Sequence, residues 1–249
     1  MIVRNTIGPL ARGTSVLDAA KSMVINESPY ALLEGAPLKM VDATQILRAL
    51  ATANGPIEMA EVLTSDVEEI AYEVPTVGEE EVLKALLIKG GAVALKGGSV
   101  ADPLYVLAEN KSKLKDEPVK KYVDDRARLV DPLLDIMSAV RRSLVYELEG
   151  YVIVGQKRPF GMATPISILK YLTSEQVISS LDAGDSSALD RAIGDLASPI
   201  PSYVNPSTST RDALAAMAEH RYEVFPVVGS NKNFVGALKA RSLLVALLG

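Results

Sequence analysis

The sequence has no cysteine, no tryptophan and a single histidine, His220. Without cysteine it forms no disulfide, no thiolate metal site and no cysteine nucleophile. One imidazole also excludes a zinc site built from several histidines. We therefore expect no metal site and no cofactor.

Long apolar runs are missing as well. The run from Leu243 to Leu248 is among the longest, and a membrane span needs about 18 to 20 apolar residues. Residues 1–13 lack the apolar core of a signal peptide. The sequence thus predicts a protein without a membrane span, with the cytoplasm as its expected location.

Basic residues are too few for a general nucleic-acid binder. Lys and Arg number 26 against 31 Asp and Glu, which gives a net charge of −5, whereas such binders show a basic domain. Hydrophobic residues make up 48% and charged residues 23%, as in folded globular proteins. We expect a folded protein with no nucleic-acid partner.

What the sequence does contain is an internal repeat. Residues 14–23 and 208–217 share Thr, Ser, Asp, Ala and Met at a fixed offset, and weaker copies lie at 128–137 and 77–86. Each copy combines a helix cap, an acidic first turn and one apolar stripe, which predicts the start of a helix.

The same order of elements follows each copy. Short apolar runs predict buried strands at 30–33, 93–95, 144–146 and 224–228. A further strand and a second helix are predicted within 38–50, 99–107, 160–172 and 234–248. The pattern predicts an α/β fold in which a strand, helix, strand, strand, helix unit occurs four times.

Units of about 50 residues rarely bury enough surface alone, so we expect them to pack as two pairs, 1–109 and 122–249. The predicted domains are repeat 1 at 1–54, repeat 2 at 55–109, a linker at 110–121, repeat 3 at 122–173, a connector at 174–195 and repeat 4 at 196–249. The linker is charged, contains a proline and lacks periodicity.

The most specific motif lies in the fourth unit. His220-Arg221 is followed by Pro226-Val227-Val228 and then by Gly236 before two apolar residues. This pattern resembles the CBS (cystathionine-beta-synthase) domain, and the fourfold arrangement is similar to the gamma subunit of AMP-activated protein kinase and its archaeal single-chain relatives. The resemblance implies a regulatory protein rather than an enzyme, whose paired repeats bind adenine nucleotides or S-adenosyl compounds and pass the binding to a partner.

The family also implies where a nucleotide binds. In a competent repeat the second helix opens with Ser or Thr, which faces the phosphate, and an Asp three residues later binds the ribose. The corresponding residues here are Asp42 and Gln45, Ala101 and Leu104, Thr164 and Ser167, and Lys239 and Ser242. No repeat keeps the Asp, and the third alone keeps the hydroxyl.

The resemblance therefore places an adenine nucleotide, AMP, ADP or ATP, in the cleft of the second pair. The predicted nucleotide-binding residues are Gly161, Thr164, Pro165, Ser167, Tyr203, Arg221, Tyr222, Glu223 and Val224. Tyr203 or Tyr222 would stack on adenine and Arg221 would reach a phosphate. A further site is predicted at Arg141, Lys239 and Ser242, whereas Asp42 would repel a phosphate from the first pair.

Each of these residues also has a structural interpretation. Thr164 is a good helix cap, Arg221 ends a helix where a cation offsets the dipole, and the tyrosines are typical half-buried packing residues. Arg141 falls at a helix end where solvated arginines are common.

The leading hypothesis is an energy-sensing regulatory protein that binds an adenine nucleotide in the second pair and modulates an unidentified protein partner. One alternative is an interaction scaffold without a ligand, which the missing Asp favours. Another is a sensor of S-adenosyl-methionine, with the cationic ligand near Asp42 or Glu223. The pairs are expected to form a flat disk, either within the chain or in a homodimer.

Overall fold

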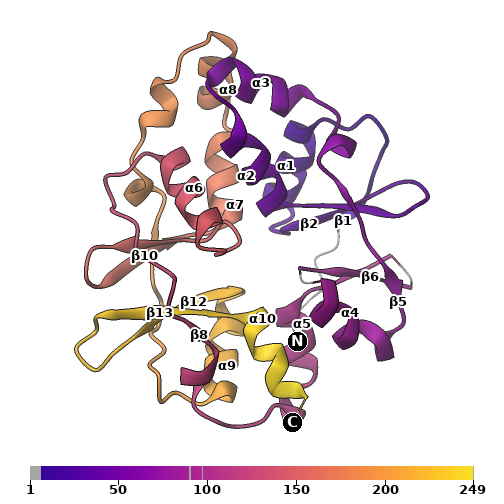
Figure 1. Cartoon of the computed structure of the whole chain (residues 1–249). Helices are drawn as coiled ribbons and strands as arrows, with labels where there is room; N and C mark the ends of the chain where they lie inside the picture. The colour runs from indigo at the N-terminus through magenta and orange to yellow at the C-terminus, as the bar shows by residue number, and fades with distance from the viewer. Residues whose placement is uncertain (1–6, 90, 97, 249) are drawn as a thin grey trace.

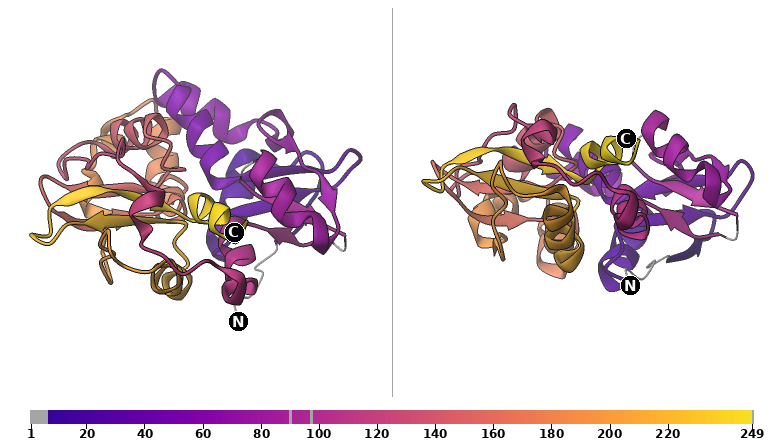
Figure 2. Two further views of the ribbon diagram at one scale, coloured as in Figure 1. Left: turned by 60° about the horizontal axis from the view of Figure 1, so that its bottom comes forward. Right: turned by 90° about the horizontal axis from the view of Figure 1, so that it is seen from below.

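Four α/β repeats follow one another in the computed structural model, which describes residues 7–89, 91–96 and 98–248 (Figure 1). The first six residues of predicted repeat 1 and residue 249 of predicted repeat 4 lie outside this part of the chain. The two pairs, one in indigo to magenta and the other in rose, orange and yellow, lie side by side in a flattened body (Figure 2).

The first pair contains repeats 1 and 2. Repeat 1 consists of β1 (Ile7–Leu10), α1 (Val16–Ile25), β2 (Tyr30–Leu33), β3 (Lys39–Asp42), α2 (Ala43–Thr52) and, beyond its predicted end at residue 54, α3 (Pro56–Thr64). Repeat 2 consists of β4 (Tyr72–Glu73), β5 (Thr76–Val77), α4 (Val82–Lys89), β6 (Val93–Leu95), β7 (Val100–Ala101) and α5 (Pro103–Glu109).

The second pair contains repeats 3 and 4. Repeat 3 consists of β8 (Val123–Asp124), α6 (Ile136–Val145), β9 (Val152–Gly155), β10 (Pro159–Ala163), α7 (Pro165–Leu172) and, within the predicted connector at 174–195, α8 (Glu175–Asp182). Repeat 4 consists of β11 (Ser198–Pro199), α9 (Thr210–His220), β12 (Val224–Val228), β13 (Phe234–Lys239) and α10 (Ala240–Leu243). In the described ranges, no helix has the length and apolar character needed to cross a membrane.

Short 3-10 turns join these elements. They lie at Val67–Glu69, Glu79–Glu81, Lys111–Lys113, Val119–Tyr122, Ser187–Asp190, Ile193–Asp195 and Leu244–Leu247.

Each of the four small sheets is built on one antiparallel hairpin. The strand orders are β1-β2-β3-β4, β5-β6-β7, β11-β10-β9 and β12-β13-β8. In three sheets the hairpin also pairs with a short strand from the neighbouring repeat, since β4 pairs with β3, β11 with β10 and β8 with β13. These exchanged strands tie the two repeats of a pair together through backbone hydrogen bonds.

Within each pair, the sheets face one another. Leu32 and Met40 of repeat 1 pack against Ala94 and Val100 of repeat 2. A similar cluster joins repeats 3 and 4 through residues that include Ile153 and Val224. The expected pairing of repeats 1 with 2 and 3 with 4 is therefore confirmed.

The helices join one pair to the other. Leu47 of α2 shares a buried cluster with Ile168 of α7, so repeat 1 packs on repeat 3. Leu107 of α5 shares another with Leu214 and Met217 of α9, so repeat 2 packs on repeat 4. Each repeat thus buries both its sheet face and its helix face, and the disk forms within one chain.

Two expectations for repeat 3 are wrong. The helix predicted from residues 128–137 begins only at Ile136, where Asp135 caps it by accepting a hydrogen bond from the Ser138 N–H. Residues 144–146, predicted as a strand, form the end of this helix and its cap, and the strand lies at β9. The apolar residues of α6 recur at helical spacing and fix the later start, because they must face the neighbouring helices.

The segment predicted as a linker, residues 110–121, packs against repeat 4. Leu114 and Val119 are buried in the core between repeats 2 and 4. The Thr210 hydroxyl donates a hydrogen bond to the Lys115 carbonyl at 2.5 Å, and the Thr210 N–H donates one to the Glu117 carbonyl at 2.9 Å. The segment is thus fastened to the start of α9.

Candidate functional site

A cavity of about 940 Å³ opens where the four repeats meet, and every repeat contributes side chains to its wall. Pockets for small molecules typically measure about 300 to 1,000 Å³. This size suits a ligand as large as a nucleotide. We call it the central cavity.

Three second helices of the repeats begin at this cavity. Asp42 caps α2 by accepting a hydrogen bond from the Gln45 N–H at 2.8 Å, and Asp102 caps α5 through the Tyr105 N–H at 2.7 Å. Thr164 caps α7, accepting from the Ser167 N–H at 3.1 Å. A helix N-terminus attracts an anion, but an aspartate cap already supplies negative charge at the first two.

Asp102 was missed by the sequence analysis, which assigned Ala101 and Leu104 to this helix start. Ala101 is instead the last residue of β7, and Asp102 is the cap. The signal was present in the sequence, because Asp followed by Pro103 is a typical cap and first helical residue. The correction adds a second aspartate to the first pair.

The cavity wall carries four partly or fully buried carboxylates, one from each repeat. They are Asp42, Asp102, Glu149 and Glu223. Burial raises the pKa of all four, because a charged carboxylate loses its hydration there. Repulsion from Asp102 and Glu149 raises the pKa of Glu223 further, so these groups lie within electrostatic range of one another.

Tyrosines hold two of these carboxylates in place. The Tyr30 hydroxyl donates a hydrogen bond to Glu223 Oε1, and the Tyr72 hydroxyl donates one to Asp42 Oδ2, each at 2.8 Å. Tyr151 accepts a hydrogen bond from the Glu223 N–H at 3.2 Å. Burial raises the pKa of all three tyrosines, which keeps them protonated. Glu223 is thereby linked to repeats 1 and 3.

Glu149 differs from the other carboxylates. Its carboxylate accepts no hydrogen bond from the residues that the structure describes, whereas its backbone carbonyl accepts one from the Thr44 hydroxyl at 2.9 Å. Lys239 and Arg241 partly offset the effect of burial by lowering its pKa. Glu149 therefore faces the cavity with free acceptor oxygens.

Basic side chains from three repeats line the same cavity: Arg48 of repeat 1, Lys170 of repeat 3, and Arg221 and Arg241 of repeat 4. Arg221 ends α9 in the left-handed conformation, with φ of 55°. The equivalent positions in repeats 1 and 3 hold Glu27 and Glu147, also left-handed. The equivalent in repeat 2, residue 90, lies outside the described residues. Among the three equivalent residues that the structure describes, only that of repeat 4 is basic.

The structure brings most of the predicted nucleotide-binding residues together. The central cavity is lined by Thr164, Pro165, Ser167, Arg221, Tyr222 and Glu223. Thr164 and Ser167 also form a reciprocal capping pair, in which the Ser167 hydroxyl accepts from the Thr164 N–H at 2.9 Å. Both residues therefore cap α7, and both also line the cavity.

The other three predicted residues are not among those that line the cavity. Gly161 packs closely on Ala197 and Ser198, and a Cβ added to it would lie 3.0 Å from Ala197 Cβ and 3.3 Å from the Ser198 carbonyl oxygen. The Tyr203 hydroxyl donates a hydrogen bond to the Pro159 carbonyl at 3.2 Å. Val224 is fully buried between the sheets of the second pair. Close packing thus explains Gly161 and Val224, whereas Tyr203 is exposed.

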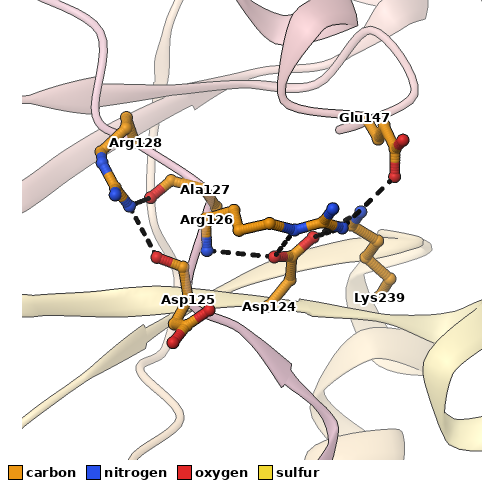
Figure 3. A network of polar contacts seen from close by, with 7 residues as sticks. All are labelled: Asp124, Asp125, Arg126, Ala127, Arg128, Glu147 and Lys239. Carbon is orange, nitrogen blue, oxygen red and sulfur yellow. Dashed lines mark hydrogen bonds and ion pairs between the residues drawn. The ribbon is translucent and has the colours of Figure 1, made fainter.

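The residues of the second predicted site are engaged elsewhere. Lys239 forms an ion pair with Asp124 at 2.9 Å, and Figure 3 shows Arg126 and Glu147 in the same network. Arg141 donates hydrogen bonds to the Ala51 and Ala53 carbonyls and lines a separate cavity of about 380 Å³. Ser242 is half-buried in α10 and is not among the residues that line either cavity.

The network around Lys239 changes the chemistry of its helix start. Although burial opposes it, hydrogen bonds from Arg126 and Lys239 lower the pKa of Asp124 to about 2. Both Lys239 and Asp124 are about nine-tenths buried, with side-chain exposures of 11% and 10%. The Lys239 ammonium is thus already neutralised by an internal carboxylate.

No three His, Asp or Glu side chains in the described ranges are placed to hold a metal ion.

Comparison with known proteins agrees with this architecture. Residues 193–249 match the family model of the CBS domain. The structure is similar to that of a Methanocaldococcus jannaschii protein described as a candidate archaeal homologue of gamma-AMPK, with 17% identity, a TM-score of 0.82, and coverage of 96% of this chain and 95% of that chain.

Over residues 193–249 the chain is thus similar to a CBS domain. The whole chain has the fold of four CBS repeats packed as two pairs, as the sequence predicted.

Shorter CBS proteins match one part of the chain. A CBS-pair protein from Arabidopsis thaliana is 22% identical, covers 54% of this chain and 96% of its own length, and has a TM-score of 0.42. Another structure is that of CBSX2 in complex with AMP, at 20% identity and a TM-score of 0.42, covering 53% of this chain and 96% of that chain. A search of curated proteins found no match.

Proposed function

We propose that this chain is a regulatory, non-catalytic protein that senses an adenine nucleotide in its central cavity. The observation that carries the proposal is the shared wall of Thr164, Pro165 and Ser167 from repeat 3 with Arg221 and Tyr222 from repeat 4. These residues come from positions that bind nucleotides in other CBS proteins, as the sequence resemblance implied.

The chemistry of the wall suits the parts of a nucleotide. Arg221 supplies a cation with five N–H donors, and the start of α7 adds the partial positive charge of a helix whose cap is neutral. Both would stabilise a phosphate. Tyr222, whose ring lies 6.4 Å from that of Tyr151, offers an aromatic edge for the base.

Buried carboxylates supply the ribose contact that the sequence lacks. The family places an Asp three residues into the second helix, where this chain has Ser167. Glu149 and Glu223 lie in the same cavity and accept hydrogen bonds well, as ribose hydroxyls require. We expect one of them to replace the missing Asp.

Regulation would act through the packing of the pairs. Repeats 1 and 4 meet across the cavity in the Tyr30–Glu223 hydrogen bond, and repeats 1 and 3 meet in the Thr44–Glu149 hydrogen bond. A ligand that contacts both pairs favours the arrangement of the pairs to which it binds best. An unidentified partner protein that binds the outer surface of the pairs would respond to this change in arrangement.

Thermal unfolding with AMP, ADP, ATP or adenosine tests the proposal. At about 100 times its dissociation constant a ligand adds roughly 2.7 kcal/mol, which raises the unfolding midpoint by about 5 to 10 °C in a chain of this size. We expect Arg221→Gln to weaken a nucleotide about tenfold or more and to leave adenosine nearly unchanged.

Lys232→Gln is the matched control. Lys232 is also left-handed, with φ of 61°, and is an exposed cation in the turn between β12 and β13. Its substitution should leave every affinity unchanged. Equal losses of nucleotide and adenosine in Arg221→Gln would remove Arg221 from the phosphate role. No midpoint shift with any of the four compounds would favour a scaffold without a ligand.

A second candidate ligand is S-adenosyl-methionine. The four carboxylates of the central cavity favour a cation, and two of them, Asp42 and Glu223, were predicted to do so. Competition between S-adenosyl-methionine and AMP separates the two. Tighter binding of the sulfonium compound, insensitive to Arg221→Gln, would replace the nucleotide as the proposed ligand.

A further inference from the structure

The outer end of the second pair exposes three large apolar side chains. Phe160 of β10 is 53% exposed, Val235 of β13 is 43% exposed, and Tyr203, in the segment before α9, is 45% exposed. Single apolar residues at a surface are ordinary, whereas several that lie together mark a place where another molecule binds. What matters is therefore whether these three side chains share one surface.

Hydrogen bonds bring the three segments to one place. The Phe234 N–H donates to the Lys157 carbonyl at 3.0 Å, which joins the β12–β13 hairpin to the β9–β10 hairpin. The Tyr203 hydroxyl donates to the Pro159 carbonyl at 3.2 Å, which places this ring beside the second hairpin. The ends of both hairpins lie at the edge of the disk that points away from the first pair (Figures 1 and 2).

Positive charge surrounds these apolar groups. Lys157 and Arg158 in one hairpin turn and Lys232 in the other are exposed, and none of them forms an ion pair within the described ranges. No Asp or Glu occurs in the segments that meet here, which are residues 155–160, 198–205 and 229–235. This surface is thus cationic on a chain whose net charge is −5. We call it the hairpin patch, and its members are Lys157, Arg158, Phe160, Tyr203, Lys232 and Val235.

The first pair treats the equivalent positions differently. Phe160 and Val235 each lie four residues before the residue that precedes a second helix, Thr164 or Lys239. The equivalent residue of repeat 1, Leu38, packs against the cluster between the sheets, and that of repeat 2 is a glycine. The fold can therefore bury an apolar side chain here, so the exposure of two of them in the second pair is a property of this surface.

The charge of the hairpin patch selects among the molecules that could cover it. A second copy that presented the same patch would bring like charges together. A nucleic acid is held through about 6 to 10 phosphate contacts, more than three cations supply, and the net charge of −5 repels it. A short acidic segment of a protein fits better. Its carboxylates would pair with the cations, and its apolar side chain would contact Phe160 and Tyr203, since arginine and aromatic residues dominate protein interfaces.

We propose that the hairpin patch binds an acidic segment of the partner protein, in which an aromatic or branched apolar side chain stands between Asp or Glu residues. The patch is connected to the central cavity, because β10 carries Phe160 near its start and ends directly before Thr164, which lines the cavity. The proposal rests on the proposed function for the existence of a partner, and it deepens that function by naming the partner's chemistry.

Selection of binders from a library of short random peptides on the unmodified chain tests the proposal. We expect the selected peptides to be enriched in Asp and Glu around an aromatic or apolar residue. Fluorescence anisotropy then measures the affinity of the tightest peptide. Phe160→Ser, and Lys157→Glu combined with Arg158→Glu, should each weaken it about tenfold or more, as the loss of a central interface residue does. Both variants change exposed side chains, and thermal unfolding with AMP checks that they fold and keep the AMP-induced shift.

Lys21→Gln combined with Ile25→Ser is the matched control, because it removes an exposed cation and an apolar side chain, 80% exposed, from α1. It should bind the peptide as tightly as the unmodified chain does. Selected peptides without acidic enrichment, or an affinity that the patch variants leave unchanged, would overturn this inference. The nucleotide function would still stand, since thermal unfolding with AMP measures it separately.

Two further outcomes would assign the hairpin patch to another occupant and overturn the inference as well. One is a dimer of the unmodified chain in analytical ultracentrifugation that Phe160→Ser dissociates, which would identify a second copy. The other is an oligouridylate that binds more tightly than the best peptide and loses affinity in Phe160→Ser, which would identify a nucleic acid.

Discussion

The first and second pairs begin their second helices with opposite chemistry. In the first pair, Asp42 and Asp102 cap α2 and α5, so both helix starts carry a carboxylate. In the second pair, Thr164 caps α7 and Lys239 precedes α10. Three of these helix starts, those of α2, α5 and α7, lie at the central cavity, and the residue at each cap decides whether that start can attract an anion.

The second pair is also divided within itself. Lys239 has the right charge for a phosphate, but the exchanged strand β8 brings Asp124 to within 2.9 Å of it. Thr164 has no charge, and it lines the same cavity as Arg221. A basic residue therefore marks an anion site only where the fold has not already supplied its counter-ion.

Among the substitutions that test this comparison, Lys239→Met should change the free energy of unfolding most. It leaves Asp124 buried without its lysine, and removal of one partner of a buried ion pair costs about 3 to 5 kcal/mol. Because Arg126 also contacts Asp124, we expect a loss of about 3 kcal/mol in the free energy of unfolding, measured by urea denaturation. Arg126→Gln, at an exposed partner, should cost much less, because a solvated ion pair is screened. Equal costs for the two variants would show that Lys239 is not the dominant partner.

Glu223→Gln should stabilise the chain at neutral pH. Burial raises the pKa of Glu223 in the folded state, so the folded chain holds this proton to a higher pH than the unfolded chain does. Stability is then lost as the pH rises from the unfolded pKa near 4.5 through the raised folded pKa. Glutamine cannot ionise and still accepts the Tyr30 hydrogen bond.

We expect a gain of roughly 0.5 to 2 kcal/mol for Glu223→Gln at pH 7, of the size usual when a functional site is relieved of strain. Denaturation at pH 5 and pH 7.5 measures it. The unmodified chain should be more stable at pH 5, and the difference should shrink in the variant. Asp124 loses its contribution only below about pH 4, so it does not interfere in this range. A variant with an unchanged pH dependence would contradict the prediction.

The smallest expected effect belongs to Thr164→Val, which removes the cap of α7. We expect a loss of about 1 kcal/mol without any ligand, because the Ser167 N–H loses its acceptor. Thr164→Ser keeps the hydroxyl and should cost far less. Thermal unfolding of both variants, with and without AMP, separates capping from ligand contact. Loss of the cap lowers the unfolding midpoint of Thr164→Val without ligand. Loss of a ligand contact also makes the rise in midpoint that AMP causes smaller than in the unmodified chain. Equal stability of Val and Ser at this position would show that the cap contributes nothing.

Local patterns were enough to predict much of the fold. The Thr-Ser-Asp-Ala-Met repeat located α1 and α9, and the pair Thr164 and Ser167 marked the start of α7. These features depend on neighbours along the chain, such as a cap three residues before the N–H that it binds. Where spacing was less regular, as before α6 and α5, the boundary was misplaced and Asp102 was overlooked.

The sequence by itself determined the α/β repeats, their packing as pairs and the caps of α1, α7 and α9, because these follow from hydrophobic spacing and short-range hydrogen bonds. Only the tertiary structure decided that Lys239 is neutralised by Asp124 and that carboxylates from all four repeats share one cavity. These contacts join residues far apart in the chain. Their geometry depends on how the exchanged strands and the helices of both pairs pack, and no local pattern records that packing.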